Sequence, residues 1–197
     1  MFKLNLKIAL RNIWKYKLTN TIKLFGLVIG LSTVIILISY VMYELSYDRQ
    51  NPNADRVYRI HLISKSENIE RSGSPLGFAK VLMNNIPEIE YATGLQASPL
   101  EVKVGENMFP AEVNRANLSY FEIFGIKLIQ GNKSALAQPN TIAISEELAK
   151  KLFPSKNAIG QTITTKNPIP RQIVAIMQDV PTASHFKGNI FVNATVD

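Results

Sequence analysis

The sequence predicts an α+β protein in which one N-terminal transmembrane helix is followed by a mixed α/β domain. Three observations predict this class. Twenty residues in a row carry no charge, basic residues are concentrated just before them, and helix-like and strand-like patterns alternate after them. We therefore expect a basic leader at 1–23, a transmembrane helix at 24–43, a linker at 44–56 and a globular domain at 57–197.

The uncharged run, LFGLVIGLSTVIILISYVMY at 24–43, is long enough to span about 30 Å as a helix, which is the thickness of a bilayer's hydrocarbon core. Twelve of its residues are Leu, Ile, Val or Phe, and together they favour insertion by roughly 4 to 7 kcal/mol. A buried core helix seldom runs this long without a charge. A cleaved signal peptide fits poorly, because the apolar run is too long and no small-x-small pattern follows it.

The charge distribution predicts the orientation of this helix. The chain holds 22 Lys or Arg and 15 Asp or Glu, for a net charge of +7, and six basic residues and no acid lie in the first 23 positions. Cations on one flank of a first membrane helix keep that flank in the cytoplasm. We therefore expect the N-terminus inside, residues from about Glu44 onward outside, and the protein in the inner (plasma) membrane. A nucleic-acid binder would spread its cations over a folded face, so we expect no nucleic-acid partner.

Residues 3–18 also have the pattern of an amphipathic helix lying in the membrane interface, with membrane lipid as its partner. Basic residues recur every four positions, and aromatic rings mark the inner interface. The apolar face comprises Leu6, Leu10, Ile13 and Trp14. The membrane-surface residues that we predict are Lys7, Arg11, Lys15 and Trp14.

Gly26 and Gly30 form a G-x-x-x-G motif within the apolar run. Small residues at this spacing let a second helix approach closely, although glycine is also common in membrane helices that make no such contact. We predict that these two glycines pack against a partner helix. A single span cannot enclose a path for a solute, so transport would require further helices.

Beyond the linker, the patterns predict strands and helices in mixed order, with no internal repeat. Three helices carry start signals, namely Ser74-Pro75 before a helix that ends at Pro87, a Ser119-x-x-Glu122 capping box, and Ser145 before a helix that ends at Pro154. The strands that we expect lie at 57–63, 91–96, 100–104, 108–115, 126–129, 141–144, 160–164, 171–180 and 190–193, with breaks at Gly94, Pro99 and 105–107.

The residues offer little chemistry. There is no cysteine, no phosphate-binding glycine motif, and only two histidines, His61 and His185, far apart in the chain. His61 reads as an ordinary, partly buried strand residue. Asp179, Ser184 and His185 could form a hydrolytic trio, but no nucleophile elbow accompanies the serine, and a polar turn explains these residue types better. We therefore expect no catalytic, cofactor-binding or metal-binding residue.

Several stretches, taken in order, resemble FtsX-like permeases of the macrolide-exporter (MacB) type. They are LKIALRNIWKYKLTNTIKLFGLVIGLS, YDRQNPNADRVYRI, YFEIFGIKLIQG, TIAISEELAKKLFP with AIGQTI, and IVAIMQDVPTASHF. The resemblance implies a noncatalytic permease subunit of an ABC transporter, with ATP hydrolysis by a separate cytoplasmic ATPase coupled to movement of a periplasmic core domain. It also implies a homo- or heterodimer of permease subunits, and it allows an envelope adaptor protein as a further partner.

The resemblance places family motif positions on thirteen residues, nearly all of which read as structural by their type. They are Tyr120, Phe121, Phe124, Gly125, Gly131, Ser145, Leu148, Ala149, Phe153, Gly160, Asp179, Pro181 and His185. Family members continue into three more transmembrane helices, so we expect this chain to be an N-terminal portion. The alternative is a single-span, membrane-anchored sensor or binding module. A reading frame that continues past Asp197 into three apolar spans favours the permease.

Overall fold

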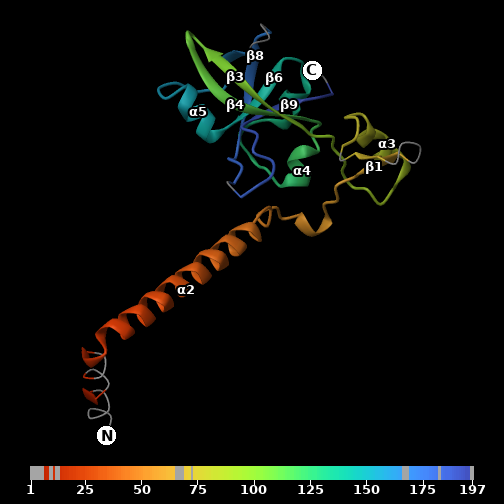
Figure 1. Ribbon diagram of the computed structural model, residues 1–197. Helices are drawn as coiled ribbons and strands as arrows, with labels where there is room; N and C mark the ends of the chain where they lie inside the picture. The colour runs from red at the N-terminus through yellow and green to blue at the C-terminus, as the bar shows by residue number, and fades with distance from the viewer. Residues whose placement is uncertain are drawn as a thin grey trace. The chain divides into compact units, whose positions relative to one another are not determined.

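The computed structural model describes residues 7–8, 11, 14–64, 69–71, 73–165, 169–181 and 183–195. The chain divides into two compact units, Met1–Tyr47 and Asp48–Asp197, which are considered separately. The first unit is helical, and the second contains all the strands among the described residues (Figure 1).

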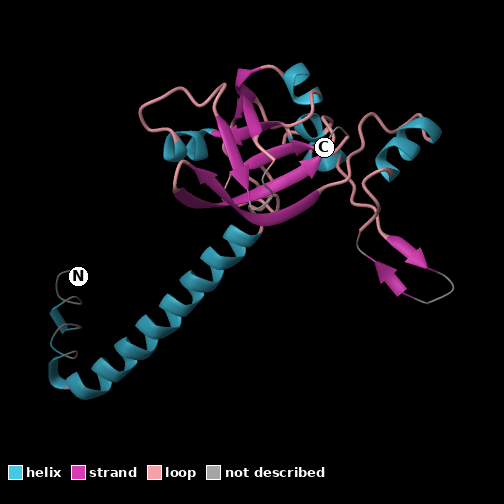
Figure 2. Ribbon diagram, turned by 90° about the horizontal axis from the view of Figure 1, so that it is seen from above, coloured by secondary structure: helices cyan, strands magenta, loops and turns pink. Residues whose placement is uncertain are grey.

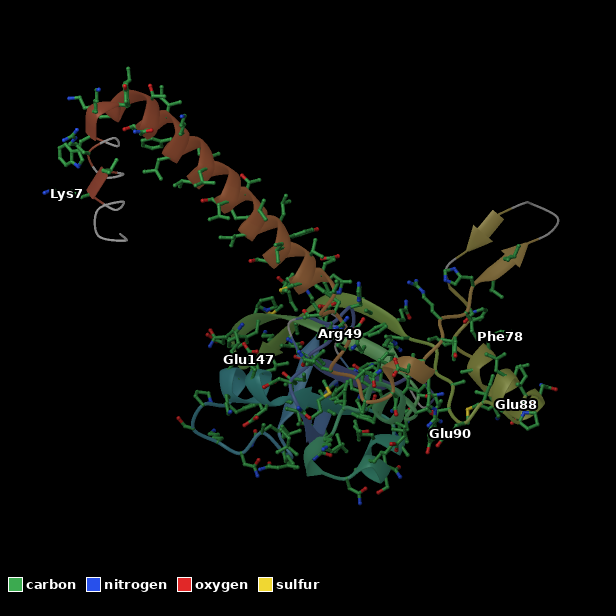
Figure 3. All side chains as sticks on the ribbon, turned by 90° about the horizontal axis from the view of Figure 1, so that it is seen from below. Lys7, Arg49, Phe78, Glu88, Glu90 and Glu147 are labelled. Atoms are coloured by element: carbon green, nitrogen blue, oxygen red, sulfur yellow. The ribbon has the colours of Figure 1, made fainter. Side chains whose placement is uncertain are left out.

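Helix α2 (Lys17–Glu44) is the main element of the first unit. Its 28 residues correspond to a length of about 42 Å, which exceeds a hydrocarbon core of about 30 Å. None of its residues is buried, and apolar side chains project from it all round (Figure 3). It is long and apolar enough to cross a membrane. The expected span at 24–43 thus lies within one continuous helix that begins seven residues earlier.

The leader before α2 is helical at each described position up to Lys15 and is interrupted at Tyr16, where φ is −113° and ψ is 42°. Its described side chains are exposed, including Trp14 at 78%. Leu6, Leu10 and Ile13, which define the apolar face of the predicted amphipathic helix, lie outside the described residues. The amphipathic helix is predicted to run to residue 18, but the break at Tyr16 separates the leader from α2 two residues earlier.

The second unit is built on one mixed sheet, whose strand order is β5-β8-β6-β9-β4-β3-β7 (Figure 2). Strand β7 pairs with β3 on one side and with the beginning of β8 on the other, so six strands close into a ring and β5 extends it beside β8. The pairs β4–β9 and β6–β8 are parallel and the others are antiparallel. The strands are β3 (Gln96–Val104), β4 (Asn107–Ala116), β5 (Leu128–Gly131), β6 (Thr141–Ser145), β7 (Thr162–Thr165), β8 (Arg171–Met177) and β9 (Ile190–Asn193).

Two apolar clusters hold this unit together. The larger one takes side chains from all six ring strands, such as Val102, Ile144 and Ile173, and is joined by Leu148 and Leu152 of α5 (Glu146–Leu152). The smaller one lies on the opposite face of β6, β8 and β9. There, residues of α4 (Tyr120–Phe124) and the 3₁₀ helix η2 (Lys133–Ala137) meet the alternate strand residues. Both faces of these central strands are therefore buried.

A smaller part of this unit carries the two-stranded sheet of β1 (Leu62–Ser64) and β2 (Ile69–Arg71) and helix α3 (Phe78–Asn85). The short 3₁₀ helix η1 (Ala54–Arg56) precedes it. Residues 57–61 belong to no strand, although their side chains alternate. The predicted strand at 57–63 is thus wrong except at its end. Val57 and Tyr58 are exposed, because residues 57–61 do not join a sheet that would bury one face of the segment. His61 is exposed too, rather than partly buried.

The expected α+β class is confirmed, and so are most elements of the ring. The strand predicted at 91–96 is wrong, because residues 91–95 are irregular and only Gln96 belongs to β3. Pro99 does not interrupt β3. It pairs with Glu112 of β4, and among the described residues β7 pairs with β3 at Val102 and Lys103, beyond Pro99.

Further differences from the expected elements include two boundaries and one cap, and β7 and β8 also differ from the ranges expected at 160–164 and 171–180. Helix α3 begins at Phe78, after Gly77, rather than at Pro75. The strand expected at 126–129 lies at β5, two residues later. The capping box at Ser119 is absent: the helix forms, but Ser119 makes no side-chain cap, and its backbone N–H donates to Asn117 Oδ1 at 3.0 Å. Glu122 pairs with Lys133 instead.

Candidate functional site

The candidate site is the segment that follows α2, residues 48–56, here called the junction segment. Its composition predicts a turn-rich connection, and it does consist of turns and η1. Within the second unit it is attached at two places, the turn at 183–186 and the C-terminal end of α4. Asp48 makes the first attachment, and Asn51, Pro52 and Asn53 make the second.

Asp48 binds the 183–186 turn through both its side chain and its backbone. Ser184 Oγ donates to Asp48 Oδ1 at 2.8 Å, and the backbone N–H of His185 donates to the same oxygen at 3.2 Å. His185 Nδ1 lies 2.7 Å from Asp48 Oδ2, and the Asp48 N–H donates to the Ala183 carbonyl at 2.9 Å. We call these four contacts the Asp48 latch. They join parts of the chain that lie 136 positions apart at Ser184 and 137 at His185.

The latch stabilises the ionised form of Asp48. Partial burial alone would raise the pKa of this carboxyl group, but the hydrogen bonds from His185 and Ser184, with the charge of His185, outweigh it, so the pKa lies below its ordinary value of 3.8. The backbone of Asp48 has a φ of +55°, a left-handed conformation that Asp and Asn tolerate better than most residues. An acidic residue suits this position both by conformation and by charge.

The second attachment satisfies the free carbonyl groups at the end of α4. Asn51 Nδ2 donates to the Ile123 carbonyl at 3.1 Å, and Asn53 Nδ2 donates to the Glu122 carbonyl at 2.8 Å. The last carbonyls of a helix have no partner within it, so these two amides cap α4 from outside. Gly125, at φ +63°, lets Pro52 approach. A Cβ on Gly125 would lie 2.5 Å from Pro52 Cδ.

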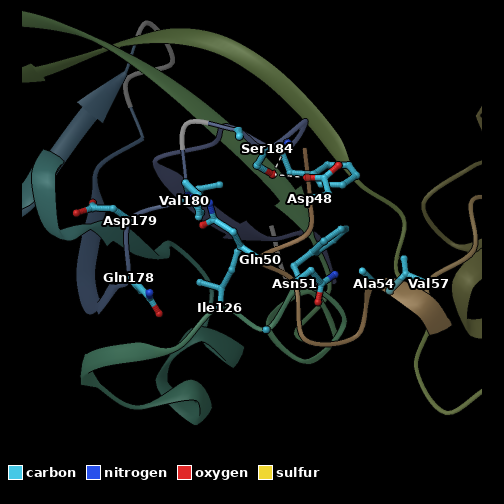
Figure 4. A pocket seen from close by; sticks show the side chains of 15 residues that line it. Asp48, Gln50, Asn51, Ala54, Val57, Ile126, Gln178, Asp179, Val180 and Ser184 are labelled. Atoms are coloured by element: carbon cyan, nitrogen blue, oxygen red, sulfur yellow. Dashed lines mark hydrogen bonds between the residues drawn. The ribbon is translucent and has the colours of Figure 1, made fainter. Parts of the chain in front are cut away.

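A pocket of about 330 Å³ lies beside the latch, between the junction segment and the core (Figure 4). Gln50, Asn51 and Val57 line it from one side, and residues 124–126, 178–181, 183, 184 and 186 line it from the other. The rings of Phe124 and Phe186 lie 4.4 Å apart in its wall. The latch and this ring pair therefore connect α4, the turn and the junction segment at a single place.

The hydrolytic trio of Asp179, Ser184 and His185 does not assemble. Asp179 Oδ1 accepts a hydrogen bond from the backbone N–H of Glu147 at 2.9 Å, at the start of α5. Ser184 directs its hydroxyl at Asp48, whereas a nucleophilic serine is hydrogen-bonded to its histidine base. Ser184 and His185 instead bind Asp48, a partner that the sequence analysis did not consider.

The other predicted site residues lie in the first unit. Lys7, Arg11, Trp14 and Lys15 are exposed along the leader, and the Lys15 ammonium lies 5.5 Å from the centre of the Tyr16 ring. Gly26 and Gly30 lie in α2, where an added Cβ would meet no atom within 4 Å. Both halves of the Asp48 latch lie in stretches that carry the family resemblance, YDRQNPNADRVYRI and IVAIMQDVPTASHF, but nothing in the sequence indicates that these stretches meet.

Comparison with known proteins relates the chain to transporter proteins. It is 19% identical over 187 residues to an uncharacterized ABC transporter permease, YknZ of Bacillus subtilis (strain 168), covering 89% of this chain and 47% of YknZ. It is 22% identical over 186 residues to the pyoverdine export ATP-binding/permease protein PvdT of Pseudomonas aeruginosa, covering 90% of this chain and 28% of PvdT. The chain thus spans less than half the length of either relative.

Solved structures show the same fold for the second unit. The periplasmic region of MacB from Actinobacillus actinomycetemcomitans matches with a TM-score of 0.50 at 19% identity, over 74% of this chain and 61% of that one. The extracellular domain of the ABC-type transporter YknZ from Gram-positive bacteria matches with a TM-score of 0.51 at 12% identity, over 62% and 64%. The sequence model of one family matches residues 22–196, and the chain therefore belongs to the family of the MacB-like periplasmic core domain.

Proposed function

We propose that the chain is part of a noncatalytic permease subunit of an ABC transporter, anchored by α2 and working in export or in mechanotransmission across the cell envelope. One observation carries the proposal: a 28-residue apolar helix with no buried residue directly precedes a core domain of the MacB-like family. The names of YknZ and PvdT, both permeases, support it. In this proposal the residues form the N-terminal portion of the subunit, and later helices complete the membrane part.

The proposed partners follow from this role. ATP hydrolysis would come from a cytoplasmic ABC ATPase. We place this ATPase on a separate chain by analogy with YknZ, whose name mentions a permease alone. In PvdT, by contrast, the name gives ATP-binding and permease parts in one protein. A second permease subunit and an envelope adaptor protein complete the proposed assembly. The decisive test is to purify the full-length protein from native membranes. We expect an ABC ATPase to copurify, and a protein isolated reproducibly without one contradicts the proposal.

The proposed orientation places the N-terminus in the cytoplasm of a cell with the core domain outside. The support is the charge distribution, with six basic and no acidic residues before position 24. An alkaline phosphatase reporter, which is active only outside the cytoplasm, is to be fused after Asp55. We expect an active reporter. A reporter that is inactive at this position, but active when the fusion point is moved before α2, shows the opposite orientation.

Gly26 and Gly30 are proposed to contact a neighbouring transmembrane helix. An added Cβ at either position meets nothing within 4 Å, so larger residues leave α2 itself undisturbed. Gly26→Ile with Gly30→Ile should therefore weaken assembly of the full-length protein in detergent without unfolding the core domain. Leu27→Ile with Leu31→Ile is the matched control. Equal assembly of both double variants contradicts a packing role.

A further inference from the structure

We propose that Asp48 is a positioning residue that couples α2 to the core domain, so that a displacement of the end of α2 is passed to the 183–186 turn and to α4. This inference rests on the proposed permease function, since only a moving assembly needs such coupling. The contacts that carry it all lie within the second unit and belong to the Asp48 latch and the two asparagine caps.

Only a few residues of the chain separate α2 from the latch. Asp48 is four residues beyond Glu44, the last residue of α2. The intervening residues form consecutive turns, in which Leu45, Ser46 and Tyr47 each donate a backbone hydrogen bond to a carbonyl three or four residues earlier. Asp48 itself is bound by its N–H and by both carboxylate oxygens. The first residue after these turns is thus the residue that is fixed to the core.

Magnitudes show why this fixation matters. A flexible linker of nine residues, the length of the junction segment, has a root-mean-square span of about 15 to 18 Å. Helix shifts that switch proteins are often only about 1 to 2 Å. A loose junction would absorb such a shift, whereas a segment held at two places transmits it. Asp48 is the residue on which this depends, because its carboxylate makes three contacts with Ser184 and His185 of the 183–186 turn.

The latch can be tested in this chain by spin-label distances. The sequence has no cysteine, so Arg49→Cys and Lys103→Cys supply the only thiols, one on the junction segment and one on β3. We expect a narrow distance distribution that broadens at least twofold with Asp48→Ala. Asp48→Asn should restore most of the narrow component, because the amide oxygen can still accept from Ser184. Asp55→Ala, an exposed acidic position in the same segment, is the matched control and should have no effect.

A second label pair guards against unfolding. Lys103→Cys with Lys150→Cys joins β3 to α5 within the core, and its distance should not change in Asp48→Ala. If this core distance stays narrow and the Arg49–Lys103 distance also stays narrow in Asp48→Ala, the latch is overturned. If both distances broaden, Asp48 supports the whole fold rather than the junction, and the positioning role is overturned as well.

Coupling is tested in the full-length protein with its ATPase in lipid nanodiscs. A fluorophore on Lys103→Cys, with other cysteines replaced by serine, reports movement of the core when Mg²⁺ and ATP are added. We expect a response that falls at least fivefold with Asp48→Ala and is unchanged with Asp55→Ala. A full response in Asp48→Ala overturns the positioning role and leaves the permease proposal standing. No response in the unmodified protein, with a narrow Arg49–Lys103 distance, overturns the permease proposal and the coupling with it, while the latch stands as a static anchor.

Discussion

The backbone of Gly131 lies tightly against the neighbouring strand β8. Its φ is +86°, and an added Cβ would lie 2.2 Å from the Val174 carbonyl oxygen and 2.7 Å from Ala175 Cα. Strand β8 carries one extra residue here, since Ile142 and Ala143 of β6 pair with Ile173 and Ala175. The bulge brings the backbone of β8 against β5.

Gly131→Ala should therefore destabilise the fold strongly. The left-handed conformation alone costs about 1 to 3 kcal/mol for a residue with a side chain, and the overlap with backbone atoms adds to this. Gly160→Ala is the matched control, because Gly160 has the same φ of +86° and no atom within 4 Å of the added Cβ. Urea unfolding followed by circular dichroism should show the larger loss at Gly131. Equal losses would mean that backbone conformation is the whole effect.

Asp48 should make stability depend on pH. Its pKa in the fold is below the ordinary value of 3.8, because hydrogen bonds from His185 and Ser184 outweigh the opposing effect of burial. The stabilisation is therefore fully present above about pH 4 and is lost as the pH falls through the lowered pKa. Asp48→Asn should be less stable than the unmodified chain near pH 6, and the difference should disappear toward pH 2. Urea midpoints at several pH values measure it; a constant difference contradicts the assignment.

At the scale of the element, helix α5 shows what a side-chain cap contributes. Ser145 is buried, and its Oγ accepts a hydrogen bond from the Leu148 N–H at 3.2 Å, as the sequence predicts. Ser145→Ala should lower the free energy of unfolding by about 1 kcal/mol. Ser119→Ala is the comparison, because Ser119 precedes α4 without a side-chain cap. Thermal unfolding should separate the two variants, and a larger loss at Ser119 would restore the predicted capping box.

The same scale explains which elements the sequence could predict. Strand β6 and helix α5 follow from a local pattern, Thr141 to Ser145, in which burial, cap and stop signals agree. Residues 57–61 alternate as well but form no strand, because alternation says nothing about whether a partner strand exists. Pro99 marks a break by its type, yet β3 continues through it because β4 pairs with it along its whole length. Whether residues 57–61 and Pro99 belong to a strand depends on pairing with another strand, and the pattern within a segment does not specify that pairing.

At the scale of the whole molecule, the ring and the candidate site both depend on contacts distant in the chain. Val113 of β4 lies beside Ile190 of β9, and short β7 closes the ring by pairing at both its edges. The Asp48 latch joins positions 136 apart through groups that are ordinary in turns. Composition and periodicity predicted the α+β class and the apolar span, but they contain no information on strand order or on which polar turns meet.

The leader and α2 lead to a prediction for the molecule in its membrane. Lys7, Arg11 and Lys15 are exposed before α2, and each basic residue near an anionic membrane surface contributes about 1 kcal/mol. Replacing all three by Gln should therefore weaken the hold on the cytoplasmic side and lower the fraction of molecules with Asp48 outside. The thiol of Arg49→Cys, the only one in this chain, can be labelled in intact cells with an impermeant maleimide, and labelling should decrease. The control is a second triple change to Gln at exposed lysines of the core domain, namely Lys103, Lys150 and Lys151. Equal labelling of the two triple variants would show that the leader charges do not set the orientation.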